Sequence, residues 1–162
     1  MKRVAVPCLL VMMALFLTIS CGKTKNDNPV TQGSGFSLSE LCISSEEILY
    51  TGIDEPDAVI IASNEGLKEV QANGTLSRCT ESTIVIADQT LHEFDCAGKI
   101  SRLPLRAMCT GNRAVLSALA SLNVVKGWVS QDALWEMIDA KYKDKAAPFH
   151  RDIEALIPFI KT

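Results

Sequence analysis

Hydrophobic and polar positions divide the chain into three kinds of segment. Residues 4–22 contain no charged side chain and are mostly apolar. Residues 22–35 are polar, rich in Gly, Ser and Asn, and without apolar periodicity, as is typical of a flexible tether. From Phe36 onward, apolar side chains recur at helical or strand-like spacing. The pattern therefore predicts an N-terminal apolar segment, a tether over 21–35 and one folded domain over 36–162.

The C-terminal part has the clearest helical pattern. It predicts a helix over 112–123 with one apolar face, formed by Val115, Leu116, Leu119 and Leu122. A second helix is expected after Ser130, because serine is a favoured N-cap residue. Proline suits the first turn of a helix but not its interior, so the last helix is expected to hold Pro148 near its start and to bend or end at Pro158.

The first part of the domain is less regular. A helix is predicted over 37–50, ending at Gly52, and another over 57–72, ending at Asn73-Gly74. Residues 58–62 form an unbroken apolar run, however, and such a run fits a buried strand equally well.

Residues 75–103 change character and favour strands. Thr, Ile and Val are dense over 83–87, and the segments 91–96 and 99–103 are the expected neighbouring strands. Turns near Asp88-Gln89 and Ala97-Gly98 would connect them. The predicted fold class is therefore α+β: a mostly helical domain with a small antiparallel hairpin or meander over 75–103.

The N-terminus has the layout of a secretory signal, with Lys2 and Arg3 before the apolar stretch. Its end, Leu17-Thr18-Ile19-Ser20-Cys21, resembles the lipobox of bacterial lipoproteins. Ser20 and Cys21 match the small residue and the cysteine, whereas Thr18 stands where the family usually has Leu. The resemblance implies removal of residues 1–20 and lipidation of Cys21. Two or three acyl chains on one cysteine would make the membrane attachment effectively permanent.

Two other outcomes fit the same segment. The uncharged stretch approaches the roughly 20 apolar residues of a transmembrane helix, so it could remain as a signal anchor. Ordinary cleavage after Ser20 would instead release the protein. In lipoproteins an Asp after the cysteine often retains the protein in the inner membrane. Gly22 occupies that position in this chain, so the resemblance implies an outer-membrane location facing the periplasm or the cell surface.

Charge and length limit the partners. Removal of residues 1–20 leaves 142 residues, enough for one domain, with 14 basic and 19 acidic side chains and a net charge of −5. This mildly acidic chain has no basic stripe of the kind that binds a phosphate backbone. We therefore expect no nucleic-acid partner.

Four cysteines fall within the predicted domain: Cys42, Cys79, Cys96 and Cys109. An even number in an exported chain predicts two disulfides, with three ways to pair them. Antiparallel pairing about the turn at 88–89 would bring Cys79 opposite Cys96 and leave Cys42 for Cys109. The chain has no CxxC spacing, so neither a zinc ribbon nor a thioredoxin-like pair is indicated.

Candidate catalytic and metal-binding groups are few. On a strand, His92 would share a face with Cys96, but Glu93 would point to the other face, which argues against a metal site. The acidic segment 54–57 lacks the spacing of a calcium loop and suits a helix start. His150-Arg151-Asp152 is interpreted as a solvated helical turn. No catalytic residue, metal or cofactor is predicted.

Trp135 is the candidate partner contact, since it lies away from the apolar stripe of its predicted helix; packing on a neighbouring helix is the alternative. These observations favour a membrane-anchored, non-enzymatic binding or accessory module of the bacterial cell envelope, contacting an envelope protein or ligand. A small hydrolase-like envelope enzyme and a purely structural lipoprotein are the alternatives.

Overall fold

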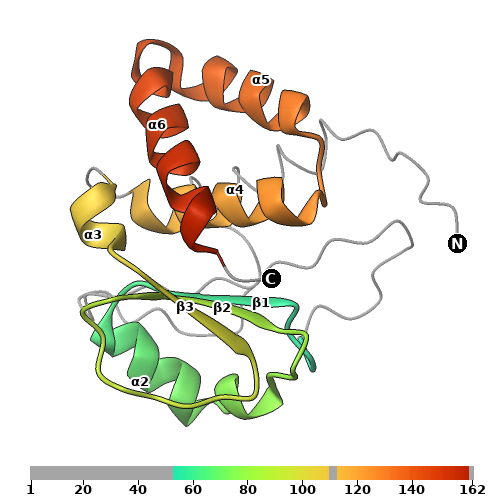
Figure 1. The fold of residues 1–162 in the computed structure, drawn as a ribbon, viewed down its shortest axis with the longest axis vertical. Helices are drawn as coiled ribbons and strands as arrows, with labels where there is room; N and C mark the ends of the chain where they lie inside the picture. Colours follow the sequence, from blue (N-terminus) through green and yellow to red (C-terminus); the bar gives the residue numbers. More distant parts are fainter. Residues whose placement is uncertain (1–52, 110–112, 161–162) are drawn as a thin grey trace, which may run out of the picture.

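The computed structural model describes residues 53–109 and 113–160 (Figure 1). The predicted signal peptide, the lipidation site Cys21, the tether and the helix predicted over 37–50 lie outside the described residues, as does Cys42. The described part is a mixture of helices and one three-stranded sheet.

All three strands of the sheet run parallel. They are β1 (Ala58–Ile61), β2 (Ile84–Asp88) and β3 (Lys99–Leu103), in the order β1-β2-β3. The helix α2 (Asn64–Ala72) and the short 3₁₀ helix η1 (Leu76–Arg78) connect β1 to β2. A loop over 89–98 connects β2 to β3.

The predicted antiparallel meander over 75–103 is therefore wrong. The segment predicted as a strand over 91–96 belongs to the loop between β2 and β3, although 99–103 is a strand as expected. The apolar run at 58–62 forms β1 rather than the start of a helix. Strands of a parallel sheet are covered on both faces and consist of continuous apolar residues. The unbroken runs at 58–62 and 84–87 carry that signature.

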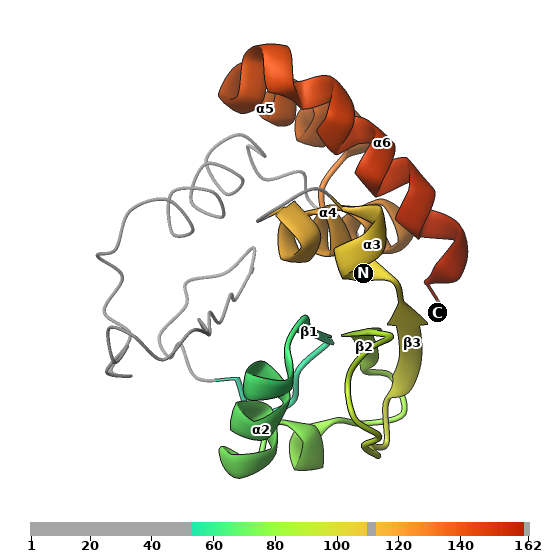
Figure 2. The same ribbon diagram turned by 90° about the vertical axis from the view of Figure 1, so that its left-hand side faces the viewer.

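Each face of β2 packs against a different layer. Val85 and Ala87 pack with residues of α2 and η1, including Leu67 and Leu76. Ile84 and Ile86 face the opposite side, where they pack with residues of the C-terminal helices: Leu105, Ala118, Leu122 and Leu156. Figures 1 and 2 show α2 on one side of the sheet and α3, α4 and α6 on the other. All five residues of β2 are buried as a result.

The C-terminal part is a layer of helices. In chain order these are α3 (Leu105–Met108), α4 (Ala114–Lys126), α5 (Gln131–Tyr142), η3 (Lys143–Lys145), α6 (Ala146–Leu156) and η4 (Ile157–Phe159). Ser130 caps α5 as predicted, because its hydroxyl accepts a hydrogen bond of 3.3 Å from the amide of Ala133. Pro148 lies in the first turn of α6, and Pro158 lies in η4, directly after that helix ends.

Helix α4 lies between the sheet and the outer helices α5 and α6. Ala118 and Leu122 pack toward the sheet, whereas Ala120 packs with α5 and α6. The predicted apolar face of this helix is wrong at Val115, whose side chain is 44% exposed. Both sides of α4 can be buried because its small residues let neighbouring backbones approach closely. For example, the hydroxyl of Ser121 donates to the carbonyl of Ile153 in α6 at 3.0 Å.

A buried carboxylate joins the end of β2 to α3. Asp88 is fully buried, and its oxygens accept hydrogen bonds from the amide of Thr90 at 2.9 Å and from the amide of Arg106 at 3.0 Å. Burial by itself raises the pKa of Asp88, but the hydrogen bonds from Thr90 and Arg106 outweigh it and lower that pKa below its usual value.

We expect Asp88→Asn to lower the free energy of unfolding at pH 7 by about 1–3 kcal/mol, because the amide group cannot accept both sets of hydrogen bonds. A carboxylate with a lowered folded-state pKa stabilises the fold above the unfolded-state pKa of about 3.9 and loses that effect as pH falls through the folded value. The difference between wild type and variant in urea unfolding should therefore shrink at acidic pH. The control is Asp144→Asn, since Asp144 is exposed. If wild type and Asp88→Asn differ by the same free energy of unfolding at every pH, the prediction is contradicted.

Gly98 permits the close approach of the loop and β2. A Cβ atom at this position would lie 2.8 Å from the carbonyl oxygen of Thr83 and 3.1 Å from a methyl group of Val85. Gly98→Ala should therefore destabilise the protein by about 1–3 kcal/mol, the usual effect of overpacking, in thermal or urea unfolding. Lys99→Ala, at the exposed neighbouring position, should change stability by less than about 0.5 kcal/mol. Equal effects of the two substitutions would contradict this role.

Candidate functional site

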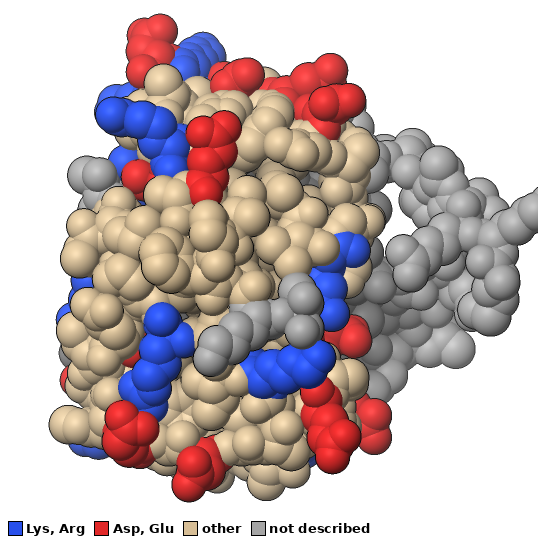
Figure 3. Space-filling view, in the orientation of Figure 1, with Lys and Arg blue, Asp and Glu red and all other residues tan. Residues whose placement is uncertain are grey.

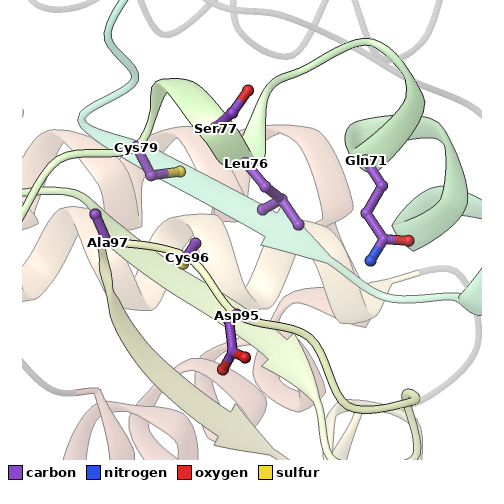
Figure 4. Close-up of a pocket in the computed structure, with 7 residues that line it drawn as sticks. All are labelled: Gln71, Leu76, Ser77, Cys79, Asp95, Cys96 and Ala97. Atoms are coloured by element: carbon purple, nitrogen blue, oxygen red, sulfur yellow. The ribbon is translucent and has the colours of Figure 1, made fainter.

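A cleft of about 340 Å³ opens beside the sheet at the edge where β2 and β3 begin. Two of its lining residues are cysteines, which are the most reactive side chains in it. The lining residues, all labelled in Figure 4, are Gln71, Leu76, Ser77, Cys79, Asp95, Cys96 and Ala97. The cleft therefore joins the end of α2, η1 and the last part of the loop over 89–98.

The parallel topology brings the two cysteines together. Cys79 follows η1 and precedes β2, whereas Cys96 precedes β3. Ile84 pairs with Lys99 at the start of these neighbouring strands, so the segments that enter both strands meet at the same edge of the sheet. The sequence prediction places Cys79 and Cys96 close together, but for the wrong reason, since it relies on an antiparallel hairpin.

The predicted disulfides are wrong in the part of the chain that the structure describes. Cys79, Cys96 and Cys109 are free thiols there, and no two of their sulfur atoms lie at bonding distance. Cys109 packs on the face of the sheet opposite to Cys79, so these two side chains are separated by the sheet itself. Its predicted partner, Cys42, lies outside the described residues.

Backbone carbonyls hold the two cleft thiols in place. The Sγ of Cys79 donates to the carbonyl of Thr75 at 3.5 Å, and the Sγ of Cys96 donates to the carbonyl of Gly98 at 3.9 Å. Burial raises the pKa of Cys79 above its usual value, and the neighbouring Cys96 raises it further. Cys79 is therefore a neutral thiol at physiological pH.

A cation lies next to the thiol pair. The guanidinium group of Arg78 donates to the carbonyl of Asn73 at 3.1 Å and to the hydroxyl of Thr75 at 3.3 Å. Its charge lowers the pKa of Cys79, but by less than burial raises it. The Nε of Arg78 is buried and makes no hydrogen bond within the described residues.

A cysteine nucleophile requires a thiolate near its base, and none of the described residues that line the cleft is a histidine. His92 is exposed in the loop, where its amide donates to the side chain of Asn64 at 3.1 Å, and it does not line the cleft. Residues 91–96 are not a strand, so the expected shared face of His92 and Cys96 does not exist. The raised pKa of Cys79 keeps it mostly in the thiol form at neutral pH, which makes it a weak nucleophile.

His150 and Trp135 meet between two helices, away from the cleft. The Nε2 of His150 in α6 lies 2.8 Å from a carboxylate oxygen of Asp139 in α5. The ring centres of His150 and Trp135 are 4.4 Å apart. Trp135, the candidate partner contact, is thus partly buried against a neighbouring helix.

The prediction that Asp152 lies in a solvated turn is wrong. Its side chain is buried and forms an ion pair with Arg113 at 3.4 Å, next to the thiol of Cys109. Burial and the charge of Asp152 raise the pKa of Cys109. The sequence contains a signal for this position, because Asp152 shares helical spacing with the buried residues Phe149 and Leu156.

A second cleft of about 600 Å³ lies between the loop, β3 and η4; the residues that form it are Glu93, Phe94, Asp95, Ile100, Arg102, Pro158, Phe159 and Ile160. The side chain of Arg102 already contacts other residues of the protein in this cleft. Its guanidinium pairs with Glu93 at 3.1 Å, donates to the carbonyl of Leu91 at 3.1 Å and lies 5.2 Å from the centre of the Phe94 ring. None of the described residues that line this cleft is a cysteine or histidine, so the thiol pair remains the stronger candidate site.

Exposure and pKa together predict the order of thiol modification. At neutral pH, an alkylating reagent should modify Cys96 several-fold faster than Cys79 or Cys109, because Cys96 is partly exposed while the others are 6% and 5% exposed with raised pKa values. Mass spectrometry of peptides from the native protein would measure the rates, with Cys109 as the control outside the cleft. Faster modification of Cys79 than of Cys96 would contradict this geometry. If neither cysteine is alkylated after unfolding without a reductant, the two are not free thiols.

No protein-family model matches the sequence, and no well-characterised protein with a similar sequence is found. Among the described residues, no helix is long and apolar enough to cross a membrane. The features of this chain that bear on function are the lipobox-like segment at Cys21 and the thiol cleft.

Proposed function

We propose that the protein is a lipid-anchored, non-enzymatic binding or accessory module of the bacterial cell envelope. The observation that carries the proposal is the segment 17–21, which resembles a lipobox and follows a basic start and an uncharged apolar stretch. Lipid on Cys21 would attach the chain to a membrane, with the outer membrane favoured by Gly22.

The polar segment over 22–35 supports this arrangement. A flexible chain of this length has a root-mean-square reach of roughly 20 Å, so the folded domain would sit just off the membrane surface. A partner or ligand bound by the domain would be held near that surface without being inserted into the bilayer.

The described domain supports a binding role. Among the described residues, its most distinctive site is a cleft lined by two thiols, which a small ligand could enter. Figure 3 shows Lys and Arg interspersed with Asp and Glu on the displayed face, with a broad uncharged area between the charged groups at the two ends. Such a surface fits a protein or small-ligand partner better than a nucleic acid.

Metabolic labelling with a palmitate analogue tests the anchor. In bacteria that express the full chain, the wild-type protein should carry the label and sediment with membranes. Cys21→Ser should abolish both, because the lipidated thiol is lost.

Cys8→Ser is the matched control, since Cys8 lies inside the apolar stretch and should not be needed for labelling. Thr18→Leu restores the residue usual in lipoproteins and should be labelled at least as well as wild type. Labelling that persists in Cys21→Ser, or an unlabelled wild-type protein, would overturn the anchor.

A further inference from the structure

We propose that Cys79 and Cys96 bind one soft monovalent metal ion, Cu(I), through their two sulfur atoms. The inference deepens the binding role proposed above, because it names a ligand for the domain. It does not depend on the lipid anchor, so the two proposals can fail separately.

The geometry of the cleft suits such an ion. Both thiols line the same open cleft, and the segments that carry them enter neighbouring strands at one edge of the sheet (Figure 4). Cys96 is partly exposed and gives solvent access, whereas Cys79 is buried behind it. Each thiol donates to a backbone carbonyl, and these two contacts would be exchanged for Cu–S bonds when the ion binds.

The number of donors selects the metal. In Figure 4 the carboxylate of Asp95 and the hydroxyl of Ser77 point away from the two sulfur atoms. Across residues 53–109 and 113–160, no group of three His, Cys, Asp or Glu side chains could hold a metal ion. Structural zinc sites need four ligands, and calcium and magnesium need oxygen ligands. Cu(I) prefers thiolates and accepts two of them in a linear arrangement.

The charge balance also fits. When Cu(I) binds, each thiol loses its proton to solvent, two Cu–S bonds form, and no electron is transferred. The product, a bis-thiolate Cu(I) group, carries one negative charge. The guanidinium of Arg78 lies close enough to affect the Cys79 thiol electrostatically, so it would compensate that charge in a partly buried site.

Proton release makes binding depend on pH. Burial and the neighbouring Cys96 raise the pKa of Cys79, so this sulfur starts as a thiol at neutral pH. Because binding displaces the proton of this thiol, the apparent affinity for Cu(I) should rise with pH.

Competition with a coloured Cu(I) chelator tests the proposal. The full mature chain, kept reduced and free of oxygen in detergent micelles, should remove one equivalent of Cu(I) that depends on the cleft. Cys79→Ser and Cys96→Ser should each weaken this binding by at least about a hundredfold, because a single thiolate remains. X-ray absorption of the copper-loaded protein should show two sulfur neighbours.

Cys109→Ser is the matched control, because Cys109 is a buried thiol on the other face of the sheet, and Cys42→Ser tests the remaining thiol of the domain. Both should bind like wild type. Circular dichroism should show that Cys96→Ser, at a partly exposed position, remains folded. Wild-type affinity in a folded Cys96→Ser, or no Cu(I) binding by the wild-type protein, would overturn the proposal whatever the result of the lipid labelling.

Discussion

Burial of β2 on both faces is the constraint on which the rest of the described structure depends. Ile84 and Ile86 point to one side and Val85 and Ala87 to the other, so each face needs its own apolar cover. Helix α2 covers one face as part of the connection between β1 and β2, and the C-terminal helices cover the other. Asp88 ends the strand with a carboxylate that is acceptable in the interior because backbone amides satisfy it.

The same constraint explains the composition of α4. A helix that packs on a sheet and on two further helices must be buried on more than one side, so a simple amphipathic stripe is not required. Small and weakly polar residues fill this role, and the side chains of Ser121 and Asn123 form hydrogen bonds with the backbone of neighbouring segments. Asn123, for example, exchanges hydrogen bonds of 3.0 and 2.9 Å with the backbone of Val129 and thereby fixes the path from α4 into α5.

The thiol cleft is a by-product of the parallel topology. Parallel neighbours begin at the same edge, and the connection from β2 to β3 must return the whole length of the strand to reach it. In this fold the return is made by a loop instead of a helix, and Gly98 lets that loop pass close to Thr83. Cys96 is thereby placed next to Cys79, on a segment with enough exposure to admit a ligand.

Local spacing was enough to locate β2, β3, the C-terminal helices and the cap at Ser130, because these depend on residues near one another in the chain. It also suggested that Cys79 and Cys96 are neighbours. Strand direction, the burial of Asp152 and the state of the thiols were decided by the tertiary structure. An apolar run shows that a strand is buried, but the strands that pair with it are distant in sequence. Only the packing of these segments determines whether the strands run parallel and whether two nearby thiols meet at bonding distance.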